Sequence, residues 1–111
     1  MADRKVREPE LSPREAVAQY ERAAKENRND AQSELNLGSA YYIAGDLDAA
    51  LAAFSSALSI SPGLDHAHYY RGVIYAKRGD KTKAREELEK VVNGGGHAML
   101  KHQARIQLQA L

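Results

Sequence analysis

The fold of this chain is decided by residues 31–64, which read AQSELNLGSAYYIAGDLDAALAAFSSALSISPGL. The following 34 residues, 65–98, keep small and large side chains in the same places: Gly38 recurs as Gly72, Tyr41 as Tyr75 and Ala50 as Ala84. A repeat of this length indicates a stack of similar supersecondary units, none of which buries its apolar face alone. Such a stack more often holds other chains than carries out chemistry in a pocket.

The composition is that of one small, nearly neutral domain. The 111 residues include 16 basic and 15 acidic side chains and no cysteine. The charge balance argues against a general nucleic-acid or membrane-surface binder, and the lack of cysteine excludes disulfides and zinc–thiolate sites. No apolar run approaches the roughly 20 residues of a membrane helix, and the basic start is not followed by the apolar run of a secretory signal. We therefore expect a cytoplasmic protein.

Apolar spacing and stop signals predict six helices joined by short turns, with no strand. Residues 1–11 show no apolar periodicity and are predicted to be a flexible segment. Ser12 and Pro13 suit the start of the first helix. Gly45 can close the second helix in the left-handed conformation, and Asp46 can cap the third. The first predicted helix begins at residue 13 and ends between residues 26 and 28. The other five predicted helices cover residues 31–44, 47–60, 65–78, 81–92 and 97–108.

These residues resemble the tetratricopeptide repeat family, which uses 34-residue helix–turn–helix units. The second unit matches the family pattern at Leu37, Gly38, Tyr41, Gly45, Asp46, Ala50, Phe54, Ala57 and Pro62. The third unit departs from it at Arg71, where an apolar residue is expected, and at Gly96, where proline is usual. The resemblance implies an all-α fold in which antiparallel helix–turn–helix repeats stack as a short right-handed α-solenoid of about six helices.

The same register extends beyond the two full units, 31–64 and 65–98. Residues 12–30 match the second half of a unit whose first helix is missing, and residues 97–111 form a final helix whose partner is missing. The predicted repeat domain is therefore 12–111. Small residues such as Gly38 and Ala50 are expected where two helices approach closely, with Phe54, Tyr41 and Tyr75 filling the space beside them.

In the resembling family, the first helices of successive units line a concave face on which peptides usually lie. Carried over residue by residue, the predicted peptide groove comprises Gln32, Leu35, Asn36, Ser39, Tyr42, His66, Tyr69, Tyr70, Val73, Lys77 and Gln103. Further inner positions are Ile43, Ala76, Leu100, Ala104 and Gln107. Tyr42, Tyr69 and Tyr70 are not required by the helix-packing pattern, and rigid aromatic side chains with a polar tip suit binding surfaces. The alternative is that these tyrosines pack against neighbouring helices.

One subset of the family binds the acidic C-termini of chaperones through lysines, an arginine and asparagines. Asn36 stands at one of these positions, but His66 and Tyr70 stand where the lysine and arginine of the following unit are expected. The sequence therefore predicts no binding of chaperone tails.

Neither metal binding nor catalysis is indicated by the pattern of polar residues. His66 and His68 lie two apart on a helix and point to different faces, and His97 and His102 are also poorly aligned. We place His66 in the groove as a hydrogen-bonding group. Residues 94–96 are three glycines with no strand before them and no lysine after them, unlike a phosphate-binding loop. The carboxylates Glu86, Glu87 and Glu89 alternate with Lys81, Lys83, Arg85 and Lys90, which is typical of a solvated helix face.

The sequence therefore predicts a non-catalytic scaffold, without metal or cofactor, that binds a protein or peptide segment in its concave groove. The alternative is a homodimer that packs the final helix, with Leu100, Ala104, Leu108 and Leu111 on one side, against a second copy. The chain could also serve as one piece of a larger assembly.

Overall fold

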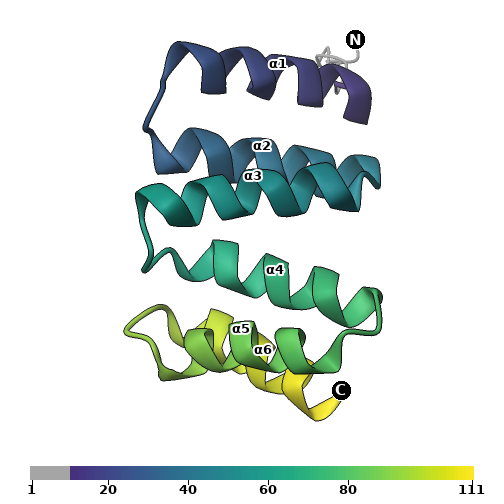
Figure 1. Cartoon of the computed structure of the whole chain (residues 1–111), viewed down its shortest axis with the longest axis vertical. Helices are drawn as coiled ribbons and strands as arrows, with labels where there is room; N and C mark the ends of the chain where they lie inside the picture. The colour runs from purple at the N-terminus through teal and green to yellow at the C-terminus, as the bar shows by residue number, and fades with distance from the viewer. Residues whose placement is uncertain (1–10) are drawn as a thin grey trace, which may run out of the picture.

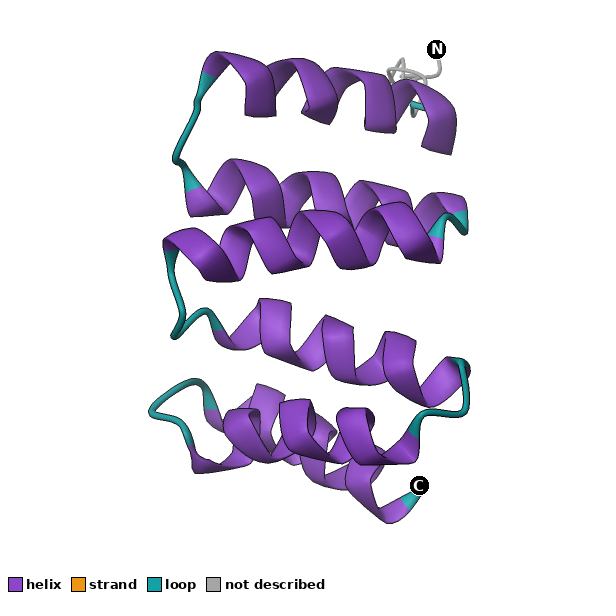
Figure 2. Cartoon of the chain, viewed as in Figure 1, coloured by secondary structure: helices purple, strands orange, loops and turns teal. Residues whose placement is uncertain are grey.

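The computed structural model describes residues 11–111, which form six α-helices and no strand (Figures 1 and 2). The helices are α1 (Pro13–Glu26), α2 (Ala31–Ala44), α3 (Leu47–Ile60), α4 (Asp65–Lys77), α5 (Lys81–Asn93) and α6 (Ala98–Gln109). The predicted all-α fold is confirmed, and the predicted helix ends lie within two residues of the observed ones. The predicted flexible segment 1–11 lies outside the described residues, except for Leu11. No helix within residues 11–111 combines the length and apolar character needed to cross a membrane.

The turns are made by the residue types that the sequence places there. Gly45 ends α2 with a φ of 85°, and Gly79 follows α4 with a φ of 81°. Both lie in the left-handed region that glycine adopts without a steric penalty. Asp46 accepts a hydrogen bond from the Ala49 amide at 3.2 Å and so caps the start of α3. Asp80 caps α5 in the same way, through the Lys83 amide at 3.1 Å.

The helices form two closely packed antiparallel pairs, α2 with α3 and α4 with α5, which stack in chain order (Figure 1). Helix α1 packs on α2 at one end of the stack. At the other end, α6 packs on α5 and also reaches α4. This arrangement is the all-α repeat solenoid that the sequence predicts. Helix α1 corresponds to the second helix of a repeat unit, and within residues 11–111 it has no first helix of its own unit to pair with.

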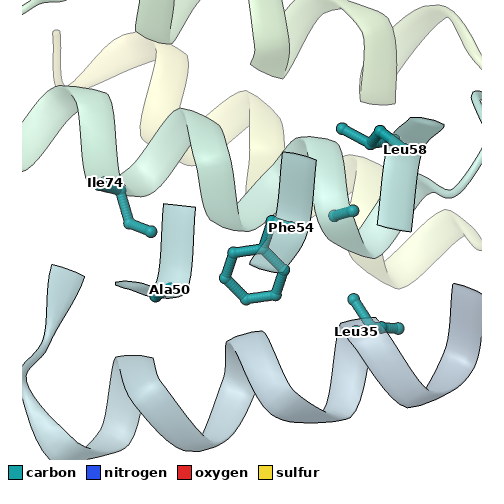
Figure 3. Close-up of a cluster of buried hydrophobic side chains, with 6 residues drawn as sticks. Leu35, Ala50, Phe54, Leu58 and Ile74 are labelled. Atoms are coloured by element: carbon teal, nitrogen blue, oxygen red, sulfur yellow. The ribbon is translucent and has the colours of Figure 1, made fainter. Parts of the chain in front are cut away.

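Within each pair, a glycine allows the two helices to approach closely. A methyl group added at Gly38 would lie 2.6 Å from Cε1 of Phe54, and one added at Gly72 would lie 2.7 Å from Cγ of Leu88. Phe54 and Leu88 are completely buried. The predicted role of the small residues at these crossings is therefore confirmed. Phe54 lies at the centre of the first core cluster, which Figure 3 shows with its neighbours Leu35, Ala50, Leu58 and Ile74.

A second core cluster joins the last three helices. Leu88 and Val91 of α5 pack against Leu100 and Ala104 of α6, and Leu108 and Leu111 extend the cluster along the same side. The apolar stripe of the final helix is therefore packed within the chain itself. The large apolar side chains that α6 leaves exposed are Met99 and Ile106.

Candidate functional site

Three tyrosines form a continuous row of rings across the first helices of the two full units. The ring centres of Tyr42 in α2 and Tyr70 in α4 are 5.6 Å apart. Tyr69 meets Tyr70 edge-on, with ring centres 5.7 Å apart. All three side chains are only partly buried. The row therefore spans the junction between two repeat units and keeps part of its aromatic surface open to solvent.

Tyr70 also belongs to the packing between units. Its ring stacks on Phe54, with centres 5.1 Å apart and planes within 7° of parallel. Tyr42 and Tyr70 both pack against the first core cluster, and Tyr69 packs against the second. The prediction that these tyrosines are surplus to helix packing is thus wrong, because the rings bridge neighbouring units. The core clusters hold each ring in place, and part of each side chain stays exposed.

Tyr69 also has a polar neighbour, Gln107 of α6. Burial raises the pKa of the Tyr69 hydroxyl, and a hydrogen bond with Gln107 lowers it. The neighbouring Tyr70 makes a smaller contribution that also raises the pKa. Because the net pKa lies above that of a free tyrosine, the hydroxyl stays protonated at neutral pH and can donate a hydrogen bond. The sequence predicts an inner-face position for Gln107, and the structure brings this side chain to Tyr69 at the end of the tyrosine row.

The remaining predicted groove residues differ in how much surface they offer. Leu35 and Val73 are buried in the core and present little surface to a ligand. Asn36 and Ser39 are partly buried. The Gln32 amide nitrogen donates to Oδ1 of Asn36 at 2.9 Å, so these two side chains form one polar group on α2. The predicted groove residues that are exposed are Gln32, His66, Lys77 and Gln103.

The histidines lie on different sides of α4, as their spacing predicts. His68 is partly buried, with Nδ1 3.0 Å from Oε1 of Glu87 and Nε2 2.8 Å from the Pro62 carbonyl oxygen. His66 is exposed and meets the ring of His97 edge-on, with ring centres 6.4 Å apart. Within residues 11–111, no three histidine, aspartate or glutamate side chains are grouped in a way that could hold a metal ion.

Glu87 corrects the prediction that the carboxylates of α5 lie on a solvated face, since it is only 4% exposed. Its carboxylate lies 3.2 Å from Nε of Arg71 and 3.3 Å from Nζ of Lys90, and it also pairs with His68. Burial raises the pKa of Glu87, but the hydrogen bond from His68 and the charges of Arg71 and Lys90 outweigh it, so the pKa lies below its usual value. The carboxylate is therefore charged at neutral pH.

The repeat register contained a signal for this ion cluster that sequence reasoning missed. Arg71 stands thirty-four residues after Leu37, and Glu87 stands thirty-four residues after Ala53. Each charged residue replaces an apolar one of the preceding unit. Because these two positions face each other between the helices of a pair, the unusual arginine and the unusual glutamate neutralise each other.

Two tetratricopeptide repeat family models match the chain, one over residues 12–65 and the other over residues 41–98. Superkiller protein 3 of Saccharomyces cerevisiae is 26% identical over 77 residues, which are 69% of this chain and 5% of that protein. The tetratricopeptide repeat and J domain-containing co-chaperone DNJ1 of Cryptococcus neoformans var. grubii is 47% identical over 53 residues, or 48% of this chain and 10% of that protein. The chain thus spans a small part of the length of these curated relatives.

A solved structure shows the same fold. The crystal structure of YrrB, a TPR protein with an unusual peptide-binding site, superimposes with a TM-score of 0.75 and 32% sequence identity. The likeness covers 85% of this chain and 48% of YrrB. Together with the two matching family models and the glycine-based helix crossings, this likeness shows that the chain belongs to the tetratricopeptide repeat family.

Proposed function

We propose that this chain is a non-catalytic protein–protein interaction scaffold that binds an extended peptide along the face formed by α2, α4 and α6. The observation that carries the proposal is the row of Tyr42, Tyr70 and Tyr69, which crosses from one repeat unit to the next. Tetratricopeptide repeat domains in general act as scaffolds for other proteins, and the related YrrB has a peptide-binding site. The cytoplasmic location expected from the sequence remains a prediction.

The tyrosine row suits a peptide because its rings are already held in place. Tyr70 is stacked on the buried Phe54, so it loses little conformational freedom when a ligand covers its outer edge. Binding to fixed side chains costs less entropy than binding to mobile ones, and tyrosine is enriched among the residues that dominate interface energies. We therefore assign the apolar contacts of the peptide to this row.

Polar side chains on both sides of the row provide partners for a peptide backbone. Gln32 and Asn36 lie on α2, and Gln103 and Gln107 lie on α6. An amide side chain can donate to a carbonyl and accept from an N–H group at once, as an extended peptide requires. Lys77 and His66 add positive or titratable groups on α4, which favours peptides that carry acidic residues.

The test uses a displayed library of random peptides to select ligands for the folded chain. The affinity of a selected peptide is then compared between the parent, Tyr42→Ala and Tyr69→Ala by isothermal titration calorimetry. We expect each substitution to weaken binding about tenfold or more, as for a central interface aromatic. Tyr75→Ala is the matched control, because Tyr75 lies on α4 but near Lys83 of α5, away from the row.

Circular dichroism melts establish that each variant is folded at the temperature of the titration. Equal affinity in the parent and in both row variants would place the peptide elsewhere on the surface and contradict the proposal. Loss of binding in Tyr75→Ala alone would do the same.

A further inference from the structure

The two complete repeat units join their helices through the same kind of apolar contact. Gly38 of α2 lies against Phe54 of α3, and Gly72 of α4 lies against Leu88 of α5. The two glycines are thirty-four residues apart, and so are Phe54 and Leu88. If α2 paired with α5, or α4 with α3, a glycine would again lie against a large apolar side chain. Apolar packing alone therefore discriminates weakly between the correct pairs and pairs that are slipped by one unit.

One pair of facing positions differs between the two units. In the third unit these positions hold Arg71 and Glu87, with Nε of the arginine 3.2 Å from Oε1 of the carboxylate. In the second unit the same positions hold Leu37 and Ala53, and Ala53 is buried. Each unit therefore matches its own two helices, charged with charged or apolar with apolar, and the two kinds of match are not interchangeable.

A slipped pairing would separate the two charges. With α2 on α5, Glu87 would face Leu37 instead of Arg71. It would also lose His68 of α4, and of its ionic partners it would keep Lys90, whose side chain is 57% exposed. With α4 on α3, Arg71 would face a small apolar residue in place of its carboxylate. Because a buried charge without its partner is strongly disfavoured, we expect each slipped pair to be disfavoured about tenfold or more relative to the correct pair.

The ion pair adds less to stability than its burial suggests. Nε of Arg71 is buried and, within residues 11–111, has no partner in hydrogen-bonding geometry, although the Glu87 carboxylate is near. Desolvation of two buried charges offsets much of their attraction, so apolar residues often replace such a pair without loss of stability. Leu37 and Ala53 show that this repeat accommodates an apolar version. The charged version therefore differs from the apolar one mainly in which helix it accepts as a partner.

We propose that the Arg71–Glu87 pair selects the partner of each helix while the chain folds. It directs α4 to α5, and it prevents α4 from taking α3, and α5 from taking α2, as its partner within a pair, in one chain or between two copies. Misassembly is a characteristic failure of chains built from repeats. A buried polar group that fixes the register of packed helices has the same effect in coiled coils. The proposal concerns folding and does not depend on the peptide site.

Refolding of the full chain tests this selection. The parent and Arg71→Leu/Glu87→Ala are unfolded in urea, diluted at several chain concentrations and analysed by size-exclusion chromatography with light scattering. Each refolded sample is compared with the same variant before unfolding, so that any association of the native chain cancels. We expect the misassembled fraction to be about tenfold larger in the double variant and to rise with chain concentration. The urea midpoint of its native form should stay close to that of the parent.

Two further variants separate selection from a general effect of charge or apolarity. Arg85→Leu/Glu89→Ala is the matched control, because it makes the same two substitutions at exposed positions of α5. It should refold like the parent. Leu37→Arg/Ala53→Glu gives the second unit the same ion pair, so that the two units again become interchangeable. It should misassemble more than the parent although it adds charge, which separates the loss of selection from greater apolarity.

Four results would overturn the proposal. The first is an Arg71→Leu/Glu87→Ala variant that refolds as completely as the parent. The second is a control variant that misassembles as often, which would assign the effect to lost surface charge. The third is an Arg71→Leu/Glu87→Ala variant that is unfolded or much less stable than the parent, which would assign the ion pair to stability alone. The fourth is a Leu37→Arg/Ala53→Glu variant that refolds as completely as the parent.

Discussion

The buried ion cluster of the third unit yields a quantitative prediction, because the second unit shows what an apolar version looks like. Glu87→Ala removes the partner of Arg71, His68 and Lys90 at once. Removing one partner of a fully buried ion pair costs about 3–5 kcal/mol. The Arg71 side chain is 22% exposed, so water takes over part of its solvation. We therefore expect Glu87→Ala to lower the free energy of unfolding by about 2–3 kcal/mol.

The double variant Arg71→Leu/Glu87→Ala places in the third unit the residues that the second unit has at Leu37 and Ala53. Replacing both members of a buried ion pair by apolar residues is often neutral, so we expect a stability within about 1 kcal/mol of the parent. The changes in the free energy of unfolding caused by Arg71→Leu alone and by Glu87→Ala alone are added and compared with the change in the double variant. The difference measures the coupling between the two side chains.

Urea unfolding followed by circular dichroism at neutral pH provides these values, with an unchanged slope as the check that the folded state is the same. The reasoning would be refuted by a double variant no more stable than Glu87→Ala alone. It would also be refuted by a loss of less than about 1 kcal/mol in Glu87→Ala, which would mean that water replaces the carboxylate at little cost.

Three further predictions concern packing and titration. Gly38→Ala should destabilise the chain by about 1–3 kcal/mol in thermal melts, because the new methyl group would lie 2.6 Å from the buried ring of Phe54. A methyl group added at Gly63 would have no neighbouring atom within 4 Å, so Gly63→Ala should melt like the parent. The lowered pKa of Glu87 contributes stability at pH values above the ordinary carboxyl pKa of 4.5, and this contribution is lost as the pH falls through the lowered value. In an acid titration of the free energy of unfolding, Glu87→Gln should not show this loss. Burial and the hydrogen bond to Glu21 raise the pKa of Tyr41 to about 12, so only the unfolded chain loses this proton between pH 10 and 12. Stability should therefore fall over this range, and the fall should be smaller in Tyr41→Phe, in which the raised pKa of Tyr69 remains.

The tyrosine row gives the proposed peptide site a direct connection to the stability of the stack. Tyr70 contacts Phe54 of the preceding unit on one side and the neighbouring tyrosines on the other. A ligand that covers the row would therefore bridge two units that otherwise meet through relatively few contacts. Because each repeat touches only its neighbours, contacts across a junction contribute strongly to the cooperativity of the whole stack.

Asn36 and Ser39 belong to the predicted groove and also line the pocket between α1 and α2. Tyr69 lies further along the stack, where it packs against the second core cluster. Tyr69→Ala therefore tests peptide binding at a distance from that pocket.

The sequence by itself determined the number and type of the helices, their ends and the close crossings within each pair. These features depend on contacts whose spacing repeats every 34 residues, and glycines, aspartates and alanines at fixed positions encode them locally. The helix crossing of Gly38 with Phe54 can therefore be predicted from the sequence alone.

Only the tertiary structure decided which polar and aromatic residues are buried. Arg71 and Glu87 lie sixteen positions apart in the sequence and read separately as an irregularity and as part of a charged surface. The stacking of Tyr70 on Phe54 depends on the contact between two units. Tyr20 is 38% exposed, whereas Phe54 at the same repeat position is completely buried against the first helix of its own unit. Burial is a property of the assembled surfaces, and the periodicity of one helix does not specify what covers it.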